Sequence, residues 1–183
     1  VVSMLAFFSL SCTQKQYSSE EIAKESKRIN EFFEKAFQRN VDRYPTWQTY
    51  LGLKTNYGKL DNETIAYAKE QLKIDKKNLE KLKSFNYEAL NQQAKISYKL
   101  FKYNLEKSIE SWDWLYYGYP LNQMFGYQSR TPSFLINMHR IASVEDAEAY
   151  VSRLKEIKRV FDERMVFNKE QKKRVSYLLT LFI

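Results

Sequence analysis

Residues able to do catalytic chemistry are few in this sequence. It has one histidine, His139, and one cysteine, Cys12. A zinc site built from histidines, or a nucleophile activated by a histidine base, would depend on His139 alone. No carboxylate stands at a spacing that would orient this ring, and we predict that His139 lies at the surface or caps a short helix. The residues therefore indicate no catalytic group, no metal ligand and no cofactor in this chain.

Paired carboxylates also occur, but in the neighbourhood of lysines. Glu20 and Glu21 are adjacent, and Glu106 and Glu110 are one helical turn apart, in segments that carry lysines as well. On a helix surface such neighbours form solvated ion pairs. We therefore expect ion pairs at these positions rather than a general acid and base.

The strongest concentration of side chains suited to binding is residues 112–132, here called the crossing segment. Its 21 residues include seven aromatic side chains, two glycines and two prolines, a composition that ends helices. The aromatic side chains could line a cleft for a sugar or a peptide. They could also fill the core where helices diverge, which is the interpretation that packing favours. The candidate contacts of a cleft are Tyr119, Asn122, Gln123, Gln128 and Arg130.

Cys12 follows an apolar run typical of the hydrophobic part of a signal peptide. Residues 1–12 read VVSMLAFFSLSC, and residues 13–19 form a polar spacer. The run is too short to span a bilayer as a helix, which needs about 20 residues. The small residues before Cys12 resemble a bacterial lipobox, in which the cysteine is lipidated. This resemblance implies a lipid anchor at Cys12 in the membrane and a location in the bacterial cell envelope, on its periplasmic or outer-membrane side; an incidental cysteine in a buried segment is the alternative.

The formal net charge of +8 is compatible with a nucleic acid partner. Lysines and glutamates nevertheless alternate along the predicted helices, and only residues 169–174 form a dense basic cluster. Solvated helix faces explain this pattern, so we expect no nucleic acid partner.

The elements that must position these residues are helical. Glycine and proline fall almost entirely into two windows, and apolar residues elsewhere recur at steps of three and four. The sequence predicts one all-α domain, an antiparallel bundle of about four long helices with an aromatic-rich irregular crossing. We predict long helices from a capping box at Ser18 and Glu21 to residues 40–44, from a cap at Asp61 or Asn62 to Leu82, over residues 87–112, and from Ser143 to Met165, with short helices from Pro45 and over residues 133–141.

Residues 119–157 carry a family resemblance. They combine Pro-Leu-Asn-Gln followed closely by glycine, a short apolar segment, and the pattern Ser-x-x-Asp-Ala-x-x-Tyr-x-x-Arg-Leu. With the segments EFFEKAF, YPTWQTYLGL and ISYKLFKYNLE, they resemble the N-terminal half of the bacterial domain-of-unknown-function family 885 (DUF885), over about residues 20–165. The resemblance implies a longer helical protein, secreted or lipid-anchored and similar to zinc metallopeptidases. Its zinc ligands would lie in a downstream His-Glu stretch followed by Pro-Gly-His, a motif absent from this sequence.

These observations lead to two hypotheses about the function of the chain. The resemblance implies the N-terminal part of a zinc-metallopeptidase-like protein, in which residues 20–165 supply scaffold and one wall of a cleft for a peptide-like substrate. Such a part is expected to be inactive alone, and residues 166–183 are expected to be a tail that diverges from the family. The alternative is a non-enzymatic helical lipoprotein that binds a ligand or partner through the crossing segment.

Overall fold

The computed structural model describes residues 16–118 and 120–181 of the chain. This part is all-α, as the sequence predicts, and contains no strand. The α-helices are α1 (Ser19–Arg43), α2 (Pro45–Tyr50), α3 (Ile65–Lys83), α4 (Gln92–Ser111), α5 (Tyr127–Asn137) and α6 (Val144–Leu181), and two 3₁₀ helices are η1 (Tyr87–Ala89) and η2 (Trp112–Trp114).

The first two helices begin where local chemistry predicts. Ser18 Oγ accepts a hydrogen bond from the Glu21 backbone, and the Glu21 carboxylate accepts one from the Ser18 backbone, so the capping box starts α1. Pro45 begins α2, where its missing N–H costs no hydrogen bond. Gly52, just after α2, has a φ of 77°, a conformation that glycine adopts without strain.

The caps of α3 and α4 differ from two of the sequence predictions. Thr64 caps α3, because its Oγ1 accepts a hydrogen bond from the Tyr67 backbone. The Asp61 carboxylate instead accepts a hydrogen bond from the Thr46 backbone. Asn91 caps α4 through a 2.8 Å hydrogen bond from the Ala94 backbone. The helix predicted over residues 87–112 is therefore split into η1 and α4.

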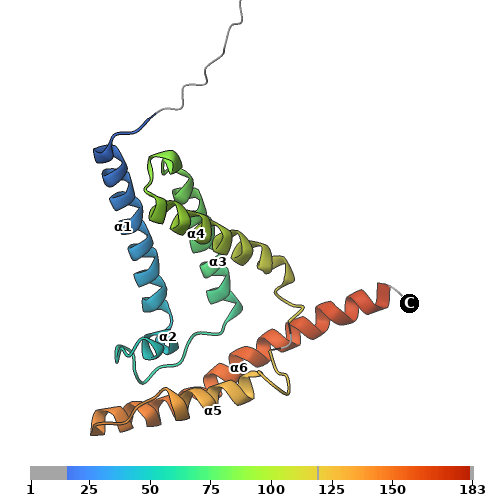
Figure 1. Cartoon of the computed structure of the whole chain (residues 1–183). Helices are drawn as coiled ribbons and strands as arrows, with labels where there is room; N and C mark the ends of the chain where they lie inside the picture. Colours follow the sequence, from blue (N-terminus) through green and yellow to red (C-terminus); the bar gives the residue numbers. More distant parts are fainter. Residues whose placement is uncertain (1–15, 119, 182–183) are drawn as a thin grey trace, which may run out of the picture.

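Helices α1, α3 and α4 form one group, in which α3 and α4 pair as an antiparallel hairpin (Figure 1). Helix α1 meets this hairpin at the end where α3 turns into α4 and diverges from it toward α2 (Figure 1). The core at the closed end is built by residues from all three helices and their connections: Ile29, Leu82, Phe85, Leu90 and Ala94. The outer face of α4, including Ile96, Leu100 and Tyr103, is exposed.

Helices α5 and α6 lie antiparallel across the open end of that group (Figure 1). Phe134 and Leu135 of α5 pack with Val160 of α6 and Leu60 of the connection before α3. Helix α5 begins at Tyr127 after Gly126, contains Pro132 and ends at Asn137, so it lies earlier in the chain than the predicted helix over residues 133–141. Pro132 stands in the middle of α5 and has no N–H to donate to the Gln128 carbonyl, so the helix lacks this hydrogen bond.

Helix α6 is the longest element, 38 residues, and does not end near Met165. Its second half contacts the crossing segment. Phe167 stacks on Tyr116 with ring centroids 5.2 Å apart, and Gln171 Nε2 donates to the carbonyls of Tyr116 and Gly118. Residues beyond Met165 therefore hold the crossing segment in place.

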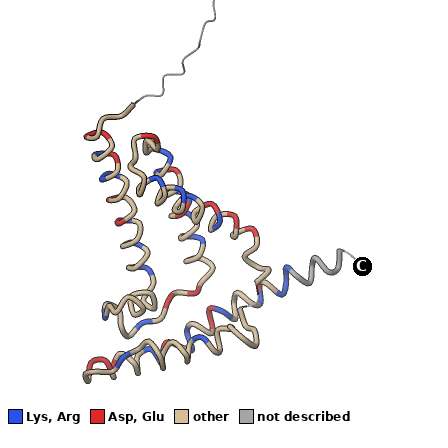
Figure 2. Tube along the Cα trace, viewed as in Figure 1, with Lys and Arg blue, Asp and Glu red and all other residues tan. Residues whose placement is uncertain are grey.

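Charges of both signs alternate along the helices (Figure 2). Within the basic cluster of residues 169–174, Lys173 and Arg174 both pair with Glu170. Among the described helices, none is long and apolar enough to cross a membrane.

Candidate functional site

Two of the predicted cleft residues hold the crossing segment together. Asn122 Oδ1 accepts hydrogen bonds from the backbone nitrogens of Met124 and Phe125, at 3.0 and 2.7 Å. Gln128 Nε2 donates to the Asn122 carbonyl at 2.5 Å. A Cβ on Gly126 would lie 2.5 Å from the Asn122 nitrogen, so the turn requires glycine. Asn122 and Gln128 therefore shape the segment.

The other predicted contacts lie elsewhere. Gln123 is exposed, and Tyr119 lies outside the described residues. Arg130 lies on the first turns of α5 and lines a cavity of about 220 Å³ between α2, α5, α6 and the connection before α3. Arg130 is thus the predicted residue that the structure brings to a cavity.

Several aromatic side chains of the crossing segment face solvent. Trp114 is 63% exposed and Phe125 72% exposed, and Tyr117 and Met124 are exposed as well. The interpretation that these side chains fill the core is therefore wrong for this group. The segment contacts α6 through Tyr116, which stacks on Phe167, whereas Trp114 and Tyr117 pack against each other at the surface.

The cavity beside Arg130, here called the polar pocket, brings together charged groups from distant parts of the chain. Asp61 and Glu63 come from the connection before α3, Tyr127 from α5 and Arg164 from α6. Glu63 pairs with Arg164, whose guanidinium lies 5.2 Å from the Tyr127 ring centroid. Two carboxylates and two guanidinium groups therefore border one small cavity, an arrangement suited to the polar backbone of a ligand.

The positions of Asp61 and Glu63 are set by backbone contacts. The Thr46 backbone donates to Asp61 Oδ1 at 2.9 Å, and the Thr46 hydroxyl donates to Asp61 Oδ2. The Glu63 backbone donates to Glu163 of α6 at 2.8 Å. Arg159 donates to the carbonyl of Asp61 at 3.3 Å and pairs with Glu163. The connection before α3 is thus tied to α2 on one side and to α6 on the other.

Burial changes the pKa values of the groups in the polar pocket. It raises the pKa of the Asp61 carboxyl, against the lowering effect of the hydrogen bonds from Thr46. Burial likewise raises the pKa of Glu63, although the positive charge of Arg164 opposes it. The pKa of the Tyr127 hydroxyl rises to about 12, mainly through burial, so this group stays protonated at neutral pH.

His139 is buried, so the prediction of a surface or capping histidine is wrong. It follows α5, and its Nδ1 lies 2.9 Å from Arg153 Nη1 while its Nε2 lies 3.0 Å from the Asp146 carbonyl. Arg153 always donates, so Nδ1 accepts and the proton sits on Nε2. Burial lowers the pKa of His139, and the charge of Arg153 acts in the same direction. A neutral histidine with both nitrogens engaged has a structural role here.

The described residues do not fit a zinc site. They hold no group of three or more His, Cys, Asp or Glu side chains that could bind a metal ion. The single histidine uses both ring nitrogens within the protein. Cys12 lies outside the described residues, so its lipidation stays a prediction.

No pattern in the sequence indicates the polar pocket. Asp61 was interpreted as a helix cap, because an acidic residue before a predicted helix usually has that role. Glu63, Tyr127 and Arg164 come from three separate elements, and no spacing in the sequence links them. Only the packing of α6 against the connection before α3 brings them together.

The structure defines an all-helical protein with a small polar pocket and an exposed aromatic segment. The family of bacterial proteins of unknown function, DUF885, matches residues 45–176, and the chain belongs to this family. The matched range includes residues 166–176, which the sequence analysis placed in a divergent tail. No curated protein and no solved structure matches the chain.

Proposed function

We propose that this chain forms the helical scaffold and one wall of a cleft that binds a peptide-like substrate in a zinc-metallopeptidase-like protein. The observation that carries this proposal is the position of Arg130, which borders the polar pocket and belongs to the crossing segment with its exposed aromatic side chains. Exposed apolar side chains next to fixed polar groups are typical of ligand-binding surfaces.

Each part of the wall has a distinct role in this proposal. The guanidinium groups of Arg130 and Arg164 donate to substrate carbonyls, and the carboxylates of Asp61 and Glu63 accept from its N–H groups. Trp114 and Phe125 contact apolar side chains of the substrate. Because His139 is neutral and engaged at both nitrogens, we assign it no step of hydrolysis.

Peptide binding tests the proposal directly. The full chain is titrated with fluorescein-labelled, unstructured decapeptides that differ in aromatic content and net charge. Replacing Arg130 with glutamine should weaken binding about tenfold, because a charged hydrogen-bond donor is lost. The matched control is Arg140→Gln, since Arg140 is also exposed but does not border the polar pocket. Equal losses for both variants would contradict the proposal.

The exposed aromatic side chains give a second measurement. Trp114 is largely exposed, so a peptide that covers it should shift its fluorescence to shorter wavelength. The shift should disappear in Trp114→Phe, while binding of the labelled peptide persists. Zinc-dependent cleavage of the decapeptides by this chain alone would refute the non-catalytic role, because that role leaves hydrolysis to residues outside it.

The alternative, a helical lipoprotein that binds a partner through the crossing segment, shares the exposed aromatic surface. The alternative predicts no contact with the polar pocket, because the partner protein would contact only the aromatic side chains. Loss of binding in Trp114→Ala with full retention in Arg130→Gln favours this alternative.

We also propose that Cys12 carries a lipid that anchors the chain in the bacterial cell envelope. The small residues before Cys12 and the polar spacer of residues 13–19 support this anchor. Expression in a bacterial host with a labelled fatty acid should label the wild-type chain. Labelling of Cys12→Ser to the same extent would rule the anchor out.

A further inference from the structure

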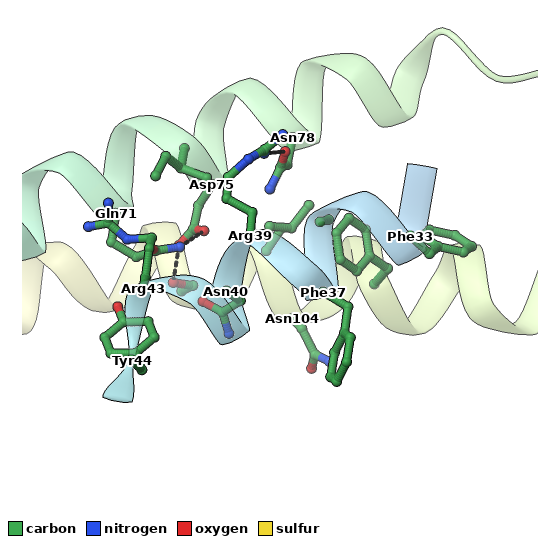
Figure 3. A pocket seen from close by; sticks show the side chains of 15 residues that line it. Phe33, Phe37, Arg39, Asn40, Arg43, Tyr44, Gln71, Asp75, Asn78 and Asn104 are labelled. Atoms are coloured by element: carbon green, nitrogen blue, oxygen red, sulfur yellow. Dashed lines mark hydrogen bonds between the residues drawn. The ribbon is translucent and has the colours of Figure 1, made fainter. Parts of the chain in front are cut away.

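A second cavity lies between α1, α3 and α4 (Figure 3), and none of its lining residues borders the polar pocket. Its volume is about 560 Å³, within the usual range for small-molecule sites. It exists because α1 packs on the α3–α4 hairpin at one end and diverges from it at the other (Figure 1). We call it the three-helix cavity.

The two ends of the three-helix cavity differ in chemistry. One end is aromatic, where the rings of Phe33 and Phe101 contact each other at an angle of 59° with centroids 5.1 Å apart. At the other end Arg43 of α1 lies beside Gln71 and Asp75 of α3 (Figure 3). A ligand that fills the cavity must therefore have an apolar part and a charged part.

The polar end is held rigidly by internal hydrogen bonds. Asp75 is 7% exposed, and its two oxygens accept from Gln71 Nε2 at 2.8 Å and from Ser108 Oγ at 2.6 Å. Arg39, one turn before Arg43 on α1, donates to Asn78 at 3.3 Å. These contacts orient the side chains before any ligand binds, which lowers the entropic cost of binding.

Two buried polar atoms at this end have no hydrogen-bond partner within the described residues. They are Arg43 Nε, a donor, and Gln71 Oε1, an acceptor. Arg43 cannot turn away easily, because its Nη2 donates to the Tyr67 carbonyl and its guanidinium lies 3.9 Å from the Tyr67 ring centroid. A buried polar atom without a hydrogen bond lowers the stability of the fold. A ligand with both an acceptor and a donor would satisfy the two atoms at this end.

We propose that the three-helix cavity binds an apolar amino acid through its α-carboxylate, either free or at the C-terminus of a peptide. The carboxylate accepts from Arg43 Nε and is attracted by the charge of Arg39. The neighbouring amino or amide N–H donates to Gln71 Oε1, and the side chain packs against Phe33 and Phe101. The charged residues that line the cavity are Arg39, Arg43 and Asp75, and Arg43 also pairs at 3.8 Å with Glu70, an exposed residue outside the lining. The excess of arginine along the lining favours an anionic group. This site is separate from the peptide wall proposed above and does not depend on it.

Calorimetric titration of the full chain with phenylalanine and its analogues tests the recognition. L-Phenylalanine represents the free amino acid, and N-acetylglycyl-L-phenylalanine represents a peptide C-terminus. Binding of either one supports the proposal, and the tighter of the two identifies the source. L-Phenylalaninamide lacks the carboxylate and 3-phenylpropionate lacks the N–H, so each should bind about tenfold more weakly or worse. Equal binding of all four compounds, or binding of none at millimolar concentration, overturns the proposal.

Substitutions locate the binding. Ala36 lines the cavity, and Ala36→Phe fills the space while keeping every charge, so it should abolish binding. The matched control, Lys35→Phe, adds the same ring at an exposed neighbouring position on α1 and should bind normally. Arg43→Gln should weaken binding about tenfold, with circular dichroism to confirm the fold. Arg130→Gln should leave it unchanged, which separates this site from the proposed peptide wall. Unaltered binding in Ala36→Phe overturns the assignment.

Discussion

At the residue scale, Arg153 of α6 fixes the connection that carries the polar pocket. Its side chain is fully buried, with Nε donating to the Lys59 carbonyl at 2.9 Å and Nη2 donating to Thr49 Oγ1 at 2.7 Å. Its third contact is His139, and burial lowers the pKa of Arg153 to about 10. A buried charge is tolerated here because every arm of the guanidinium has a partner.

Removing Arg153 should therefore be costly. We predict that Arg153→Met lowers the free energy of unfolding by about 2 kcal/mol or more, because it leaves buried acceptors without donors. Urea unfolding followed by circular dichroism measures the change. The control is Lys158→Met on the same helix, where the side chain is 84% exposed and pairs only with Asp162. A similar loss in the control would show that the effect comes from α6 itself.

Asp61 gives a second prediction at this scale, on pH. Its raised pKa means that the folded chain binds this proton more tightly than the unfolded chain, whose carboxyl has a pKa near 3.8. As the pH falls from neutral toward 3.8, the wild-type chain should gain stability relative to Asp61→Asn, which has no proton to bind. Urea unfolding of both proteins over this range measures the difference. A difference that stays constant with pH would contradict the prediction.

At the element scale, the helix caps decide where α4 begins. Asn91 caps α4 with its side chain, whereas Asn86, which precedes η1, makes no side-chain capping bond. The Asn91 backbone also donates to Ser26 Oγ at 2.9 Å, which ties the start of α4 to α1. The closed end of the three-helix group thus depends on this cap.

The two asparagines form a matched pair. We predict that Asn91→Ala lowers the free energy of unfolding by about 1 kcal/mol, the usual cost of losing an N-cap. Asn86→Ala should cost clearly less, since it loses only an exposed hydrogen bond to Tyr17. Thermal unfolding of both variants distinguishes them. Equal losses would mean that capping does not set the start of α4.

Helix α6 links the two halves of the site at the same scale. Near its beginning Asp146 binds Lys54 and the Ala142 backbone, and in its middle Arg153 and Arg159 hold the connection before α3. Its later part, with Phe167, supports the crossing segment. One long helix therefore positions both the polar pocket and the exposed aromatic side chains.

At the scale of the whole molecule, the described residues form two apolar clusters rather than one continuous core. The first joins α1, α3 and α4 around Ile29 and Leu82, and the second joins α5 and α6 around Phe134 and Val160. The three-helix cavity lies beside the first cluster and the polar pocket beside the second. Each proposed site is thus supported by its own cluster.

A pair of leucines tests the first cluster. Leu82 is fully buried and Leu100 is 59% exposed, although both lie on helices of the same hairpin. We predict that Leu82→Ala lowers the free energy of unfolding by about 2–5 kcal/mol, as core truncations do. Leu100→Ala should stay within about 0.5 kcal/mol of wild type. Chemical unfolding of both variants measures this, and a large loss for Leu100→Ala would show that its helix face is covered in solution.

The sequence by itself determined the helical class, the family and the starts of α1, α2 and α6, because apolar periodicity and caps such as Ser18 and Ser143 act over a few residues. The sequence also indicated that the crossing segment interrupts the long helices. Tertiary structure alone decided that Trp114 and Phe125 face solvent and that His139 is buried. It also decided that Asp61, Glu63 and Arg164 share a pocket. These outcomes depend on which helix lies against which, and contacts between residues about a hundred positions apart leave no local pattern in the chain.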